Sequence, residues 1–270
     1  MRAKLKANYR SLRIGFCDDD QNDHTHEASY SHGIYAIIAS CPSIRAIAGY
    51  QAVIRRCVFI TGASGYMGRS LIPTLLARGH TVRALARAAS AQRVPHGAEI
   101  VLGDALDATT FAKAVAPADT FVQLIGTPHP SPTKAASFRA VDLASVDAAL
   151  TAALEAGIQH FIYVSVAQPA PVMAAYIAAR QAGEERIRAS GIPATILRPW
   201  YVLGPGHRWP YVLVPFYALF ESLPATREAA RRLGLVTLKQ MVAALVSSIE
   251  RGPQGVRVID VPGIRAAASG

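Results

Sequence analysis

Short apolar runs alternate with longer segments of helical periodicity from about residue 53 onward. The runs are rich in β-branched and aromatic residues and are bounded by glycine, proline or polar residues, as strands are. They predict strands at 53–61, 81–86, 98–102, 120–125, 160–166, 194–197 and 256–261. The segments between them predict helices at 66–77, 105–115, 135–156, 173–190 and 235–250. Strands that alternate with helices at this interval are typical of a parallel sheet covered on both faces.

Residues 1–52 lack this alternation. Five of the first thirteen residues are basic, and a polar stretch with several acids, among them Asp18 and Glu27, follows. This segment has neither the apolar core of a secretion signal nor the acid-poor composition of a transit peptide. Its histidines and cysteines match no familiar metal-ligand spacing, so we expect no metal site. Composition predicts a disordered N-terminal extension over 1–52, and an upstream start codon would also produce such a segment.

The stretch CVFITGASGYMG at 57–68 joins the first strand to the first helix. Its glycines follow the spacing GxxGxxG, which permits a tight turn, close approach of a diphosphate and close packing of helix on strand. The free N–H groups at the start of the helix favour phosphate. The pattern predicts a Rossmann-type doubly wound α/β fold that binds a dinucleotide cofactor. The expected contacts in the turn are Thr61, Gly62, Ser64, Gly65, Tyr66, Met67 and Gly68.

The charges that follow the glycines indicate which dinucleotide is bound. No acid lies between Gly68 and Glu99, whereas Arg83 and Arg87 lie in and just after the second strand. A free ribose 2′-hydroxyl prefers an acid here and a 2′-phosphate prefers arginine, so NADP(H) is favoured over NAD(H). The alternative is that these arginines are solvated ends of a surface strand. Asp104, after the third strand, is predicted either to accept the adenine amino group or to cap the next helix.

Composition and charge exclude several classes of protein. The chain has 270 residues and a formal net charge of +10 that is spread along its length, so no nucleic-acid-binding stripe is formed. No apolar run approaches the roughly 20 residues that a membrane span needs. Three widely spaced cysteines indicate a reducing compartment, and we expect a cytoplasmic protein. Nothing in the sequence indicates an oligomeric state.

The order TGASGYMG, VRALAR, GDALD, YVSVA and LRPWYVLGPG resembles that of the atypical or extended short-chain dehydrogenase/reductases, especially NmrA-like and epimerase-type NAD(P)-binding proteins. The resemblance covers residues 55 to about 260. It implies catalysis by a serine after the fifth strand and by a Tyr-x-x-x-Lys pair on the next helix. Ser165 and Tyr176 match these positions, while Arg180 stands where the family has lysine. The family often has asparagine in the helix after the fourth strand, where this chain offers Asp142.

The arginine limits the chemistry that the resemblance implies. Tyr176 and Arg180 are four residues apart and share a helix face, so a cation can favour the tyrosine phenolate. Arginine can also bond the cofactor ribose, but it does not readily exchange a proton. Hydride transfer with Tyr176 as the acid therefore remains open, whereas a lysine-type proton relay does not. The alternative is a buried helix tyrosine whose hydroxyl is satisfied by Arg180 or by backbone.

The C-terminal part carries the candidate substrate residues. We expect a dinucleotide-binding domain at 53–200 and a small substrate lobe at 201–270, packed on the same domain, with the strand at 256–261 finishing the lobe. Trp200, His207 and Trp209 are candidates to line a pocket for an apolar, aromatic or quinone-like molecule. The uncharged run 211–220 suits a greasy lid, weak peripheral contact with a membrane or a helix buried on the sheet.

Gly126 and Thr127, after the fourth strand, should lie beside the cofactor, and His129 is a weaker candidate for substrate contact. The leading interpretation is an NADP(H)-dependent oxidoreductase that acts on a carbonyl or quinone-like small molecule. One alternative is a redox sensor or assembly factor that binds the dinucleotide without catalysis. Another is a sugar-nucleotide epimerase, which the apolar segment after 206 disfavours.

Overall fold

The computed structural model describes residues 55–127, 131–170, 172–205 and 227–268. The fold below belongs to the second of two units of the chain, Val53–Gly270. The expectations for 1–52, His129, His207, Trp209 and 211–220 lie outside the described residues.

A seven-stranded parallel sheet forms the centre of the second unit, in the order β3-β2-β1-β4-β5-β6-β9. Its strands are β1 (Cys57–Thr61), β2 (Thr81–Ala86), β3 (Glu99–Leu102), β4 (Thr120–Gln123), β5 (His160–Val164), β6 (Ala194–Leu197) and β9 (Val256–Ile259). From β1 the chain first adds strands on one side and then, from β4 onward, on the other, so the order reverses between β1 and β4. The expected doubly wound parallel α/β fold is confirmed. In such folds ligands bind at the carboxyl ends of the strands between which the order reverses.

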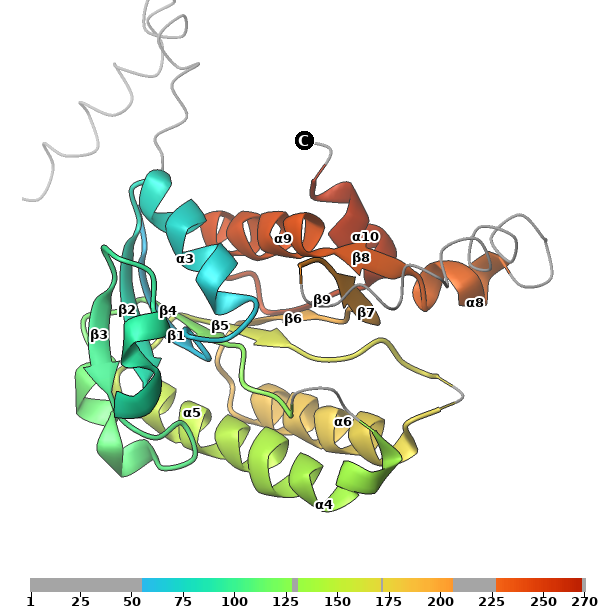
Figure 1. Ribbon diagram of the computed structural model, residues 1–270, viewed down its shortest axis with the longest axis horizontal. Coiled ribbons are helices and arrows are strands. Elements are labelled where there is room, and N and C mark those ends of the chain that lie inside the picture. The colour runs from blue at the N-terminus through green and yellow to red at the C-terminus, as the bar shows by residue number, and fades with distance from the viewer. Residues whose placement is uncertain (1–54, 128–130, 171, 206–226, 269–270) are drawn as a thin grey trace, which may run out of the picture. The chain divides into compact units, whose positions relative to one another are not determined.

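Helices cover both faces of this sheet (Figure 1). The main ones are α3 (Gly68–Ala77) and α9 (Leu238–Arg251) on one face, and α5 (Ala144–Glu155) and α6 (Ala174–Ala189) on the other. Neighbouring residues of a strand point to opposite faces. Ile60 accordingly packs in the core with α3 and α9, whereas Phe59 packs in the core with α5.

The prediction of a helix at 105–115 is wrong. The structure has two short 3₁₀ turns there, Ala108–Thr110 and Ala112–Ala114. Asp107 accepts a hydrogen bond from the Thr109 backbone N–H, and the Thr110 hydroxyl donates to the Asp107 carbonyl at 2.7 Å. Short polar side chains that bond the nearby backbone compete with a regular helix, which explains why the helical pattern is not realised.

The end of the chain also differs from expectation. The strand predicted to finish the substrate lobe is β9, which pairs with β6 and extends the main sheet. The following residues form a helix, α10 (Val261–Ala266). Asp260 starts this helix by accepting a hydrogen bond from the Gly263 N–H at 3.0 Å. Outside the main sheet, β7 (Tyr201–Leu203) and β8 (Leu235–Thr237) form a small parallel pair.

The helix predicted at 135–156 is interrupted by a change of winding. It consists of α4 (Ala135–Ser137), the π-helix η5 (Phe138–Leu143) and α5. Both Phe138 and Asp142 of η5 are buried. No helix within the described residues is long and apolar enough to cross a bilayer.

Candidate active site

Two glycines of the turn between β1 and α3 leave no room for a side chain at their own positions. Gly62 has a φ of +73°, which disfavours any other residue. A Cβ on Gly68 would lie 2.5 Å from the carbonyl oxygens of both Gly62 and Ala63. Ser64, Tyr66 and Met67 are half-buried along the turn and Gly65 is exposed. A bare backbone cradle before a helix N-terminus fits a dinucleotide diphosphate.

A buried chain of polar side chains begins at this turn. The Thr61 hydroxyl donates to the Gln123 carbonyl oxygen, so this side chain bonds β4. Gln123 then donates to the Ser145 hydroxyl at 2.9 Å, and Ser145 donates to the Asp142 carbonyl oxygen at 3.0 Å. This series of hydrogen bonds joins β1, the strand before the turn, to the π-helix η5 on the other side of the sheet. Sequence reasoning missed Gln123, although an amide in an otherwise apolar strand was visible.

The two arginines of β2 have different surroundings. Arg83 forms an ion pair with Glu99 of β3 at 2.7 Å, so its charge is already matched. Arg87 is exposed at the carboxyl end of β2, beside the end of β1. Asp104 is exposed, and its Oδ1 accepts a hydrogen bond from the Leu106 N–H at 3.0 Å. Asp107, not Asp104, caps the next turn. Of these two arginines, Arg87 is the exposed one.

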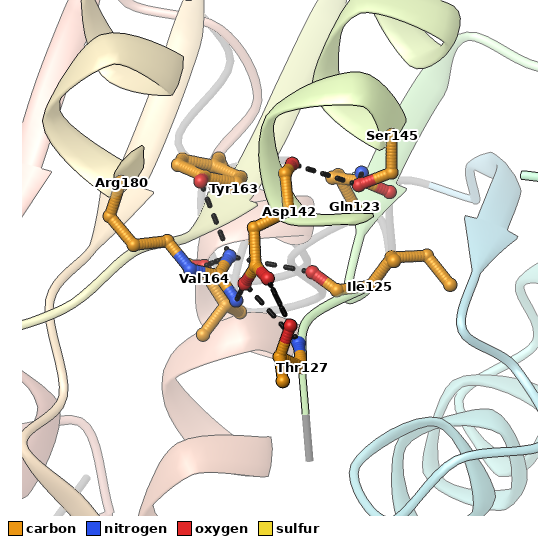
Figure 2. Close-up of polar contacts among 8 residues, drawn as sticks. All are labelled: Gln123, Ile125, Thr127, Asp142, Ser145, Tyr163, Val164 and Arg180. Atoms are coloured by element: carbon orange, nitrogen blue, oxygen red, sulfur yellow. Dashed lines mark hydrogen bonds and ion pairs between the residues drawn. The ribbon is translucent and has the colours of Figure 1, made fainter. Parts of the chain in front are cut away.

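Arg180 is buried at the carboxyl ends of β4 and β5, where Asp142 lies between it and Thr127 (Figure 2). Its Nη2 lies 2.7 Å from Oδ1 of Asp142, with both side chains almost fully buried. Its Nη1 donates to the Val164 carbonyl at 2.9 Å and to the Tyr163 hydroxyl at 3.2 Å. Burial lowers the pKa of Arg180, but Tyr163, Tyr176 and Asp142 outweigh it, so the net pKa is raised. The guanidinium is therefore a fixed charge.

Asp142 also holds the loop that follows β4. Its carboxylate accepts hydrogen bonds from the Thr127 hydroxyl at 2.5 Å and from the Thr127 N–H at 3.2 Å. A Cβ on Gly126 would lie 2.1 Å from Nη2 of Arg180, so this position requires glycine. The structure thus joins Gly126, Thr127, Asp142 and Arg180 in one buried cluster. Asp142 and Arg180 stand where the resembled family often has asparagine and has lysine, respectively. In this structure the two residues form a single ion pair.

Tyr176 lies one helical turn before Arg180 and is half-buried. The Arg180 Cζ is 5.2 Å from the centre of the Tyr176 ring, within the range of a cation–π contact. Phe138 of η5 packs against the same ring, with centroids 5.1 Å apart. The π-helix therefore contributes Phe138 to the ring of Tyr176 and Asp142 to the cation beneath it. Within the described residues, no hydrogen bond to the Tyr176 hydroxyl is recorded.

Ser165 belongs to a different network. Its hydroxyl donates to Oε1 of Glu184 at 2.6 Å. Glu184 also accepts hydrogen bonds from Gln168, Arg188 and Arg198. Burial raises the pKa of Glu184, but the bonds from Arg198 and Ser165 outweigh it, so the net pKa lies below its ordinary value. Because the carboxylate holds the Ser165 proton, this serine offers only lone pairs to a ligand. Among the described residues, no hydrogen bond joins Ser165 to Tyr176.

Glu184 was missed because an acid in a polar helix is indistinguishable by sequence from a solvated one. Its spacing of four residues from Arg180, on the face that Tyr176 also shares, was the available signal. Of the predicted substrate residues, Trp200 is half-buried and packs edge-on against Tyr201, with centroids 5.4 Å apart. It also packs against the core that contains α3 and α9.

The fold and the glycine turn define a dinucleotide-binding protein of the short-chain dehydrogenase/reductase type. The chain belongs to the NAD(P)H-binding family, whose model matches residues 62–216. In fold it resembles Bordetella bronchiseptica WbmH in complex with NAD⁺, with a TM-score of 0.57, 20% identity and 75% and 74% of the two chains covered. It also resembles Thermus thermophilus UDP-glucose 4-epimerase in complex with NAD, with a TM-score of 0.56, 17% identity and coverage of 79% and 81%.

Sequence relatives are reductases and dehydrogenases. The chain is 28% identical to a ceramide reductase of Caulobacter vibrioides, over 72% of this chain and 61% of the relative. It is 34% identical to a 3β-hydroxysteroid dehydrogenase/Δ5→4-isomerase of Mycobacterium tuberculosis, over 40% and 31%. It is 36% identical to a farnesyl-dihydroquinoline-oxide ketoreductase of Stigmatella aurantiaca, over 40% and 32%. The chain thus spans less than two thirds of each of these relatives.

Proposed function

We propose that the protein is an NADP(H)-dependent reductase that acts on a carbonyl group of a bulky apolar molecule. The observation that carries this proposal is Tyr176, whose ring lies over the buried Arg180 at the carboxyl end of the sheet. The glycine cradle after β1 suits the dinucleotide, and Arg87 suits its 2′-phosphate. We infer a cytoplasmic enzyme from the widely spaced cysteines.

When bound, NADPH would supply the hydride. Tyr176 is the group that donates a proton to the carbonyl oxygen, because its hydroxyl is not held by another described residue. Arg180 holds a guanidinium beneath the ring, with its Cζ 5.2 Å from the ring centre, and so fixes the position of the tyrosine. Arg180 does not relay the proton, since it stays protonated. Ser165 is not assigned the task of donating to the carbonyl, because its proton is directed at Glu184.

The substrate class rests on composition and on the relatives. Ceramide, a steroid and a farnesyl quinoline, which the names of the relatives mention, are all bulky and mainly apolar. Trp200 follows β6 at the same end of the sheet and supplies an aromatic surface for such a molecule. A substrate drawn from lipid would also be consistent with weak peripheral contact with a membrane.

Oxidation of NADPH in the presence of long-chain ketones, steroid ketones and quinones tests the proposal. We expect turnover with at least one apolar ketone and a loss of at least about 100-fold in kcat for Tyr176→Phe. Tight binding of NADPH with no turnover on any acceptor would favour a redox sensor instead. That second candidate is supported by Arg180, whose charge the protein already neutralises with Asp142.

The preference for NADP(H) has its own test in the two arginines of β2. Arg87→Gln should lower the affinity for NADPH by about 10- to 100-fold, since one charge-assisted contact is lost. The affinity for NADH should stay nearly unchanged. Arg83→Gln is the matched control, because Arg83 already pairs with Glu99 and should have little effect. Fluorescence titration with both dinucleotides gives the affinities. Equal losses of NADPH and NADH affinity in Arg87→Gln would contradict the assignment.

A further inference from the structure

The end of β7 touches the glycine turn at one point. A Cβ on Gly204 would lie 2.1 Å from the hydroxyl oxygen of Tyr66 and 3.3 Å from Cζ of the same ring. Tyr66 lies within the turn, between Gly65 and Gly68, and its hydroxyl is shielded from solvent. Two segments 138 positions apart in the sequence, the turn and the end of β7, therefore meet without space between them.

The need for glycine at this position is steric. Gly204 is not in the left-handed region, so its backbone would accept any residue. The obstacle is Tyr66 on one side and Leu238, whose Cβ would be 3.2 Å from the added carbon, on the other. Non-bonded carbon and oxygen atoms do not approach to 2.1 Å, so a side chain here would displace the tyrosine by about 1 Å.

We propose that Gly204 is a positioning residue for the dinucleotide: it sets the place of Tyr66 and, through it, the backbone of the glycine turn. The inference rests on the proposed function for its ligand. Tyr66 belongs to the glycine turn, the segment proposed to bind the diphosphate, and its ring lies against Gly204. A displacement of about 1 Å in a positioning group can lower the catalytic rate on the order of 100-fold.

A double-mutant cycle between Gly204 and Tyr66 tests the inference. Fluorescence titration with NADPH measures the Kd of wild type, Gly204→Ala, Tyr66→Phe and the double variant. In the wild-type background, Gly204→Ala should raise the Kd for NADPH by at least about 10-fold. In the Tyr66→Phe background the same change should cost less than about 3-fold, because the atom that obstructs the new methyl is absent. Val202→Ala, which weakens β7 without adding an atom beside Tyr66, should leave the Kd unchanged.

The same cycle, read by urea unfolding without dinucleotide, separates this inference from the proposed function. If wild type binds no dinucleotide, the proposed function fails, while coupling between the two positions in the unfolding midpoint still shows that Gly204 positions Tyr66. Equal effects of Gly204→Ala in both backgrounds would overturn the inference. So would a Gly204→Ala variant that binds NADPH as tightly as wild type does.

Discussion

Arg180 shows how one substitution changes what a residue can do. A lysine at this place has one compact charge and three rotating donors, whereas a guanidinium has five donors in a fixed plane. Here that plane is bonded to Asp142, Val164 and Tyr163 at once. Such a group cannot swing toward a ligand without breaking several buried contacts. Its role is to hold charge and position, not to transfer a proton.

The first prediction concerns the buried ion pair. Asp142→Asn should lower the free energy of unfolding by about 3 kcal/mol, because it leaves the Arg180 charge buried without its partner. Arg180→Gln should cost a similar amount for the converse reason. The double variant Asp142→Asn/Arg180→Gln removes both charges and should recover at least half of either loss. Urea unfolding monitored by circular dichroism measures all four proteins.

Strictly additive losses in this cycle would contradict the coupling of the pair. The kinetics of the double variant add a second measurement, since it restores stability but not the charge beneath Tyr176. We expect its kcat to stay low, because the charge beneath the proton donor is gone.

Some residues of the site could be predicted from the sequence and others could not, for physical reasons. Helical spacing predicted that Tyr176 and Arg180 share a face, and the cation–π contact confirms this. The partner of Ser165 was beyond reach, because nothing in the sequence marks Glu184 as buried. The pairing of Asp142 with Arg180 depends on the fold, which brings together residues from two helices.

The elements differ in how well their patterns predict them. β2 and β6 have the predicted bounds, whereas β4 and β5, although fully buried, end two residues earlier than predicted. The π-helix η5 was not predicted, since one widened turn leaves the apolar periodicity almost unchanged. π-helical turns are frequent at functional sites. In this protein the widened turn contributes both Phe138 and Asp142 to the surroundings of Tyr176.

The second prediction concerns the start of α9. Thr237 and Gln240 form a capping box, in which the Thr237 hydroxyl accepts from the Gln240 N–H at 3.2 Å and the Gln240 side chain accepts from the Thr237 N–H at 2.8 Å. Thr237→Ala should cost about 1 kcal/mol of stability, whereas Thr237→Ser should cost little. Thermal unfolding measures both variants. Equal losses in the two would show that the cap is not the stabilising feature.

At the scale of the whole molecule, the two ends of the sheet have different tasks. The carboxyl ends of β1, β4 and β5 lie beside the glycine turn, Thr127 and Arg180 of α6. At the amino ends, His160 begins β5 and is almost fully buried. It is bonded to Thr195 of β6, with 2.9 Å between the His160 Nε2 and the Thr195 hydroxyl oxygen. Arg257 of β9 donates to the same hydroxyl at 3.2 Å, so three strands meet there.

The third prediction follows from His160. Burial, Arg257 and Arg56 lower its pKa from 6.5 to about 4, against a smaller opposing effect of Asp119. The unfolded chain therefore takes up a proton between pH 6.5 and 4 that the folded protein excludes. The stabilising effect of this residue is complete above pH 6.5 and is lost as the pH falls toward 4, by up to about 3 kcal/mol.

A variant that cannot titrate isolates this effect from that of the carboxylates. His160→Gln keeps a group that can accept from Thr195, so it should fold and have a flatter dependence of stability on pH between 6.5 and 4. The exposed His96→Gln is the control and should follow wild type. Urea unfolding at half-unit steps of pH gives the three curves. Parallel curves for wild type and His160→Gln would mean that the buried histidine does not govern the acid sensitivity of the sheet.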